Sequence, residues 1–399
     1  MNNSEREKTV REPLFHIEKR GDISRKKGLL IRGIAILAAL IVSGVFSAIL
    51  LKGNPFVFYE KIIDGAVGTE RRIWNLLRET ALLLGVALAI VPAFKMKFWN
   101  LGGNGQVLVG CLATTACMFY FGGKVPLGLL IVFMMLAGVI AGAIWALIPA
   151  IFKAQWKTNE SLFTLMMNYI AEGLVAFFLT IWVKTGSGVL NPMRDYKVPE
   201  VINSSFIPII VIVLLTAAMY IYLKYSKQGY EISVVGESEN TARYVGINVK
   251  KVVIRTLIIS GAICGLVGFL LSGAIHGTVS KATHGGMGFT AIMVAWLAKF
   301  NPLIMAGTSF FVVFLERGVA EASSYFGVTN TAFPDIVTSI IFFFIIGCEF
   351  FIQYRLRFRA KKKSGIAAEK TVVKAEKKDS VEVSEESDDS AKAKKEDKA

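Results

Sequence analysis

Apolar residues in this chain form long uninterrupted runs that are separated by short polar segments. A helix needs about 20 consecutive apolar residues to cross a bilayer, and most of the runs approach that length. The pattern predicts an all-α, polytopic membrane protein with about ten transmembrane helices. The expected spans are 29–51, 80–94, 107–121, 125–152, 162–183, 206–223, 252–275, 288–298, 303–315 and 334–353, and it stays open whether residues 288–318 form one span or two.

Composition and charge agree with this fold class. Hydrophobic residues make up 54% and charged residues 19% of the 399 positions, which excludes one ordinary soluble core. The net charge of +15 lies mostly in terminal segments and short loops, where it sets orientation in the lipid bilayer and does not indicate nucleic-acid binding. The four cysteines lie inside apolar runs without disulfide or metal-ligand spacing, so we expect small core residues at Cys111, Cys117, Cys264 and Cys348.

The distribution of lysine and arginine predicts the domain organisation and its sidedness. We expect a cytoplasmic N-terminal segment over 1–28, a membrane domain over 29–353, and a basic, then mixed-charge, disordered cytoplasmic tail over 354–399. The first apolar run is too long for a signal-peptide core, so it predicts a retained signal-anchor helix. Basic residues also place a polar loop, 225–252, in the cytoplasm, although five basic residues within 52–78, outside on this topology, weaken the orientation signal.

The polar loop has the pattern of a short capped helix. Ser238 or Glu239 can cap it, residues 240–244 can form it, and Gly246 can end it in a left-handed turn. A capped helix that a membrane protein presents to the cytoplasm is a natural docking element for a soluble partner. The alternative is a structured loop without a partner, and composition alone does not choose between the two.

Polar residues inside two expected spans are candidates for a solute path. Asn168 and Glu172 lie four residues apart and share a helix face, and a carboxylate at membrane depth costs several kcal/mol unless it faces a cavity, a partner or a proton. Asn104 and Gln106 lie in a glycine-rich stretch that opens another span. The alternative for these side chains is packing and hydrogen bonding between helices.

A shared Gly-Gly-x-Gly pattern indicates a weak internal repeat. It opens one expected span at 102–105 and another at 285–288, which predicts that spans two to five and seven to ten are inverted copies with the solute path between them. Coincidence is the alternative, because the chain contains 36 glycines.

Several of these stretches resemble a known family. Val235-Gly-Glu237 followed by Asn240-Thr-Ala-Arg-Tyr-Val-Gly-Ile-Asn248 is similar to the coupling loop of ABC transporter permeases that import sugars, branched-chain amino acids and nucleosides. Thr164-Leu-Met-Met-Asn-Tyr-Ile170 and the segment 288–302 resemble further patterns of that family. One position departs, because family members typically have Glu-Gly-Gln where this chain has Asn104-Gly-Gln106.

The resemblance implies a type II importer fold with two inverted repeats. It further implies that the short helix fits a groove on an ATP-hydrolysing subunit and transmits its motion to the membrane. The positions that would form this contact are Gly236, Glu237, Asn240, Ala242, Arg243, Tyr244, Gly246 and Ile247.

The same resemblance implies the cargo, partners and location. The matches are most similar to nucleoside permeases, with a sugar as the other solute. The expected partners are a cytoplasmic ABC ATPase, a second permease subunit that is a copy or a relative, and an extracytoplasmic solute-binding lipoprotein. We expect a bacterial cell membrane, with both termini cytoplasmic.

Catalytic patterns are missing from the sequence. It contains no phosphate-binding Gly-x-x-x-x-Gly-Lys-Ser/Thr, and its three histidines have no zinc-site spacing. We therefore expect no catalytic residue, no metal site and no cofactor on this chain, with ATP and magnesium on the partner ATPase. The alternative function is a secondary transporter driven by an ion gradient, with Glu172 as the ion site. Such a carrier does not need the capped polar loop.

Overall fold

The computed structural model describes residues 15–19, 25–51, 53–183, 189–328 and 332–358. The expected disorder of the tail after residue 358 therefore lies outside the described residues. The chain divides into two compact units, one formed by residues 1–35 with 347–399 and the other by residues 36–346. The second unit contains every element that carries the functional argument.

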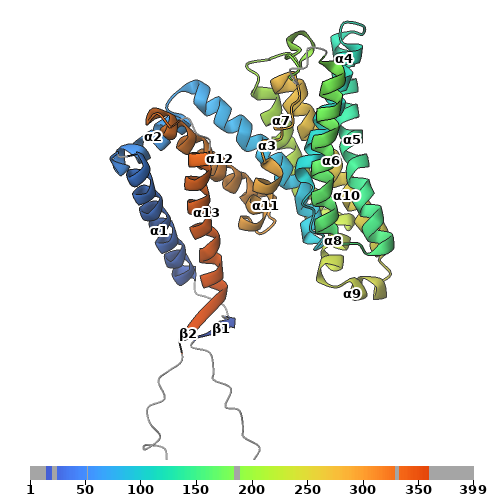
Figure 1. Cartoon of the computed structure of the whole chain (residues 1–399). Coiled ribbons are helices and arrows are strands. Elements are labelled where there is room, and N and C mark those ends of the chain that lie inside the picture. Colours follow the sequence, from blue (N-terminus) through green and yellow to red (C-terminus); the bar gives the residue numbers. More distant parts are fainter. Residues whose placement is uncertain (1–14, 20–24, 52, 184–188, 329–331, 359–399) are drawn as a thin grey trace, which may run out of the picture. The chain divides into compact units, whose positions relative to one another are not determined.

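Helices dominate the described residues (Figure 1). Their bounds are α1 Arg25–Leu51, α2 Pro55–Val67, α3 Glu70–Lys95, α4 Gly103–Phe121, α5 Leu127–Trp156, α6 Glu160–Trp182, α7 Phe206–Tyr225, α8 Lys227–Glu237, α9 Glu239–Tyr244, α10 Val249–Phe269, α11 Met287–Leu297, α12 Pro302–Tyr325 and α13 Ala332–Gln353. Two irregular helical turns join them, η1 at Arg194–Tyr196 and η2, a π-helical continuation of α10, at Leu270–His276.

Nine of the described helices are long and apolar enough to cross a membrane, and α11 is a shorter apolar helix. Together they account for the ten expected segments and confirm an all-α polytopic membrane protein. One helix extends beyond the end that its charged residues had suggested. The helix α12 continues to Tyr325 through Glu316 and Arg317, which line a pocket together with other polar residues.

Two short strands flank the membrane helices. The strand β1, Phe15–Lys19, pairs in antiparallel register with β2, Tyr354–Phe358. Residues 354–358, at the start of the basic segment that the sequence predicted, therefore form a strand. Alternation of apolar and charged residues in both segments explains the strands. Because β1 precedes the first span and β2 follows the last, their pairing brings the two segments that flank the membrane helices together.

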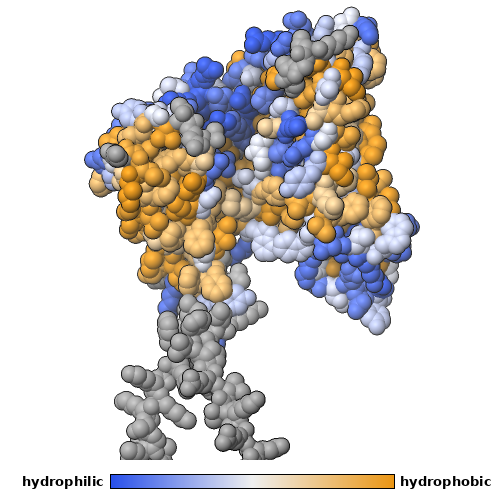
Figure 2. All heavy atoms as spheres, in the orientation of Figure 1, coloured by the Kyte–Doolittle hydropathy of each residue, from blue (hydrophilic) through white to orange (hydrophobic). Residues whose placement is uncertain are grey.

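The bundle of α4, α5 and α10 forms the densest helix packing in the second unit (Figure 1). A Cβ atom on Gly261 would lie 2.3 Å from the Gly142 carbonyl oxygen, and one on Gly265 would lie 2.2 Å from that of Gly138. The two backbones touch there, because small residues let helices approach closely. The outer faces of these helices are apolar, while hydrophilic side chains gather over α8 and α9 at one end (Figure 2).

Candidate functional site

The segment α8–α9 forms the expected capped helix. The Ser238 hydroxyl accepts a hydrogen bond from the Thr241 amide at 3.3 Å, which caps α9, and Gly246 has a φ of +80° just after its end. The sequence treated 225–252 as one polar loop, but its first half is α8, which is capped by Ser226. Two capped helices therefore meet at Ser238, which serves as the C-cap of α8 and the N-cap of α9.

One side of α9 is anchored and the other is free in the structure. Ala242 is fully buried, while Tyr244 is 91% exposed. Arg243 lies 3.7 Å from Glu239 in an exposed ion pair, a type of contact that contributes little to stability. The other positions that the family resemblance implies for the ATPase contact divide in the same way. Glu237, Asn240 and Gly246 are exposed, Ile247 is partly buried, and Gly236 is buried.

The helix α8 rests directly on the end of α3. A Cβ atom on Gly236 would lie 2.0 Å from the carbonyl oxygen of Lys95, so only glycine permits this approach. On the other side of α8, Glu231 forms a 2.9 Å ion pair with Arg255 of α10. A displacement of α8 must therefore move the end of α3, α10, or both.

An aromatic pocket opens beside this contact. Its volume is about 500 Å³, and it is lined by Phe94, Lys95, Lys97, Trp99, Ser233, Gly236, Glu237, Trp296 and Phe300. The rings of Trp99 and Trp296 stack with their centroids 5.6 Å apart, and both side chains are about half exposed. Phe94 and Phe300 pack against this pair. Aromatic rings from α3, α11 and the loops beside them thus meet over the polar residues of α8.

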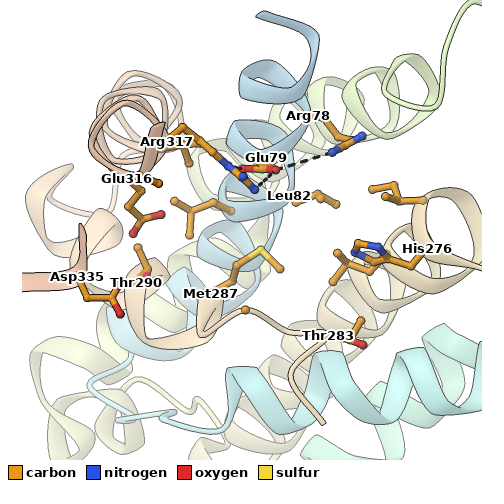
Figure 3. Close-up of a pocket in the computed structure, with 16 residues that line it drawn as sticks. Arg78, Glu79, Leu82, His276, Thr283, Met287, Thr290, Glu316, Arg317 and Asp335 are labelled. Atoms are coloured by element: carbon orange, nitrogen blue, oxygen red, sulfur yellow. Dashed lines mark hydrogen bonds and ion pairs between the residues drawn. The ribbon is translucent and has the colours of Figure 1, made fainter. Parts of the chain in front are cut away.

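A charged pocket lies at the other end of α3 (Figure 3). Its volume is about 460 Å³, and its polar lining residues are Arg78, Glu79, His276, Thr283, Thr290, Glu316, Arg317 and Asp335. The guanidinium of Arg317 binds both carboxylate oxygens of Glu79, and Arg78 lies 3.8 Å from the same carboxylate. A charged cavity inside membrane helices marks a solute or ion pathway by default.

The same two helices line both pockets. Residues 78, 79, 82 and 83 of α3 face the charged pocket, and residues 94 and 95 face the aromatic pocket. The helix α11 presents Met287 and Thr290 to the first pocket and Trp296 to the second. Between them, Val86 and Ile90 of α3 are fully buried. The two pockets therefore lie toward opposite ends of α3 and α11, with buried α3 side chains between them.

The four polar residues that the sequence proposed for a solute path line neither pocket. The Asn168 side chain accepts a hydrogen bond from the Gly105 amide at 2.8 Å and donates one to the Leu101 carbonyl at 2.9 Å. The Asn104 side chain accepts from the Gly288 amide at 2.6 Å, and the Gln106 amide pairs with buried Asn100. These contacts fasten the start of α4 to α6 and α11, and their role in a path stays a prediction.

The two Gly-Gly-x-Gly patterns meet at that point. A Cβ atom on Gly103 would lie 3.3 Å from the Cα atom of Gly288, and one on Gly288 would lie 2.5 Å from the Asn104 amide. The starts of α4 and α11 are therefore in backbone contact. The predicted inverted repeat stays a prediction.

Glu172 contacts a turn outside the spans. Its carboxylate lies 3.7 Å from Nε2 of His284, while Nδ1 of that imidazole accepts a hydrogen bond from the Gly286 amide at 2.9 Å. Burial lowers the pKa of His284, and the Glu172 carboxylate only partly opposes this shift. The imidazole is therefore neutral near pH 7.

Sequence reasoning missed the acidic and basic residues of the charged pocket. It ended a span at 315, just before Glu316 and Arg317, and gave Asp335 no role. The available signal was that Glu316 and Arg317 directly follow the apolar residues 303–315, because charges within a membrane helix point to a cavity. No group of three or more His, Cys, Asp or Glu side chains suited to a metal ion occurs in the described part of the chain.

Comparisons with known proteins agree with this architecture. The nucleoside ABC transporter permease protein NupB of Lactococcus lactis is 27% identical over 364 residues, covering 86% of this chain and 97% of NupB. The guanosine ABC transporter permease protein NupP of Bacillus subtilis is 27% identical over 352 residues, covering 84% and 97%. The glucose ABC transporter permease protein TsgB13 of Haloferax volcanii is 27% identical over 341 residues, covering 81% and 88%.

No solved structure matches the chain significantly. A family model described as the permease component of branched-chain amino acid transport systems matches residues 72–346, which is more than half of the chain. That range contains both pockets' α3 and α11 residues and the whole of α8–α9. The chain therefore belongs to the family of branched-chain amino acid transport system permease components.

Proposed function

We propose that this chain is the membrane-spanning permease subunit of an ATP-driven importer that carries a nucleoside, with a sugar as the other candidate solute. Two of the similar permeases are named for nucleoside or guanosine transport and one for glucose, which supports this choice of solutes. An extracytoplasmic binding protein would deliver the solute, and a second permease subunit would complete the pathway. ATP and magnesium would bind to a separate cytoplasmic ATPase.

The observation that carries this proposal is the backbone contact between Gly236 and Lys95. It joins a capped, largely exposed helix pair to the helix that lines both pockets. An ATPase that moves α9 would move α8 as a rigid lever, since α8 is held between Lys95 and the Glu231–Arg255 ion pair. The force would reach the end of α3 beside the aromatic pocket.

A transport cycle follows from this connection. The charged pocket would accept the solute while the stacked Trp99 and Trp296 rings keep the aromatic end closed. ATP-driven motion of α8 would displace Lys95 and separate the two indoles, which opens the aromatic end. Because buried α3 side chains fill the space between the charged and the aromatic pocket, the two pockets would not open together.

The test is uptake by cells or proteoliposomes that contain the complete transporter. Nucleoside uptake should persist when proton and sodium gradients are collapsed at constant ATP, and it should stop when ATP is removed. A co-purifying ATPase should be recovered with the wild-type chain. Loss of uptake on gradient collapse at constant ATP would instead favour a secondary transporter, in which the Glu172–His284 contact would be the first place to look for ion coupling.

A further inference from the structure

The charged pocket has two chemically different walls (Figure 3). Glu316 of α12 and Asp335 of α13 present carboxylates on one side, next to the hydroxyl-bearing side chain of Thr290. His276 and Thr283 lie on the opposite side, and Arg78 approaches from above them in the view. The pocket therefore offers hydrogen-bond acceptors on one wall and mainly donors on the other.

The two arginines of the pocket contact a different carboxylate, that of Glu79. Arg317 binds Glu79 through both oxygens, and Arg78 approaches the same group at 3.8 Å. Neither Glu316 nor Asp335 forms an ion pair in the described part of the chain. The wall that they form thus presents two carboxyl groups, neither of which is in an ion pair among the described residues.

Glu316 is partly buried and Asp335 is exposed, and each carboxylate needs hydrogen-bond donors or a cation as its partner. Water molecules supply these hydrogen-bond donors while the pocket is open. A solute that enters and displaces this water must supply donors itself, or the carboxylates lose their partners. An anionic solute would meet the carboxylates with a like charge, which costs far more than it costs a neutral solute in a cavity of reduced dielectric constant.

We propose that the Glu316 and Asp335 wall binds the donor edge of an uncharged solute, such as nucleoside hydroxyl or amino groups, while His276, Thr283 and Arg78 bind its acceptors. This inference rests on the proposed function and specifies its substrate class. The wall admits nucleosides and excludes their phosphorylated forms. The volume of about 460 Å³ lies within the range of small-molecule sites.

The charge of the wall can be measured without transport. Thr290→Cys places a thiol beside the two carboxylates, and Thr283→Cys places a matched thiol on the opposite wall. The partly exposed native Cys117 is first changed to serine, since the other three cysteines are buried. Rates of reaction with a cationic and an anionic methanethiosulfonate reagent then report the local potential in the intact transporter.

We expect the cationic reagent to react at position 290 at least roughly tenfold faster than the anionic one, since a single nearby charge has at least this effect at an effective dielectric constant near 20. The ratio should fall toward that of Thr283→Cys when Glu316→Gln or Asp335→Asn is added. Each amide keeps the shape of the acid, and the two separate variants guard against misfolding of one. An equal rate for both reagents at position 290 would overturn the acidic wall.

Solute protection completes the test. Guanosine should slow the reaction of the methanethiosulfonate reagents with Thr290→Cys, and guanosine 5′-monophosphate at the same concentration should not. Protection by both compounds, or by neither, would overturn the substrate class. These outcomes do not depend on the energy source, so ATP-driven uptake without selective protection refutes this inference alone, whereas gradient-driven uptake refutes the proposed function alone.

Discussion

The two ends of α3 and α11 differ in chemistry although the same helices build both. At one end, the ion-paired Glu79 and the unpaired Glu316 face a charged cavity of about 460 Å³. At the other end, stacked Trp99 and Trp296 cover a cavity of about 500 Å³ that touches α8. Only the second end is connected to α9, whose exposed side chains are available to a partner.

This difference indicates a division of labour. Charged groups recognise a solute through directional hydrogen bonds, but they would bind water rather than close a route. Aromatic rings exclude water and separate at modest cost, because each stacked pair contributes only about 0.5–1.5 kcal/mol beyond its burial. Recognition therefore suits the charged end, and controlled release suits the aromatic end beside the lever formed by α8.

The largest expected effect is an all-or-none difference in labelling between the two ends. Positive charges predict that α9 is cytoplasmic, whereas the exposed turn at Asp195 should lie outside. In a background without reactive cysteines, Asp195→Cys should react with an impermeant maleimide in intact cells. Asn240→Cys should react only after permeabilisation. Labelling of position 240 in intact cells would place α9 and the aromatic pocket outside and would overturn this topology.

The contact between α8 and α3 gives the next largest effect. Gly236→Ala places a methyl group 2.0 Å from the Lys95 carbonyl oxygen, which forces the helices apart. Overpacking of this kind costs roughly 1–3 kcal/mol, so coupling should fall roughly 5- to 150-fold. The rate of solute-stimulated ATP hydrolysis by the purified transporter measures this coupling. Gly307→Ala, at a helical glycine with open space around it, is the matched control and should behave as wild type.

A smaller loss is expected from the end of α9. Gly246 has a φ of +80° with open space around it, so a substitution is strained by its backbone alone. The left-handed conformation costs a non-glycine residue roughly 1–2 kcal/mol, so Gly246→Val should weaken ATPase co-purification about fivefold or more while membrane insertion is unchanged. Arg243→Lys should weaken it less, because lysine keeps the charge but loses the planar fork. Normal binding and transport by both variants would contradict a docking role for α9.

The smallest expected effect is a local pH response of the turn at 277–286. The pKa of His284 is lowered in the folded turn, so as pH falls below about 6.5 the opened turn takes up a proton first and the stability of the closed turn decreases. Above that pH the stabilisation is retained. Hydrogen exchange of this segment, corrected for intrinsic rates, should therefore rise on acidification. His284→Asn can still accept the Gly286 amide but does not titrate, so it should remove the pH dependence.

The sequence by itself determined the membrane segments and the capped helix. Apolar runs place spans because crossing the hydrocarbon layer is a requirement on consecutive residues. The Ser238 cap and the stop at Gly246 were also visible, since a cap bonds an amide three residues away and a left-handed turn selects glycine locally. Both features depend on neighbours along the chain.

Only the tertiary structure decided which polar residues share a cavity. Glu79 and Arg317 are separated by 238 positions, and Asn104 and Gly288 by 184. The sequence singled out Asn168 and Glu172 because they share a helix face, but that face bonds to the start of α4 and to the His284 turn. Helix periodicity shows which residues lie together on one helix. Which helix that face meets depends on how backbones pack through sites such as Gly236 and Gly288, and no local pattern encodes that choice.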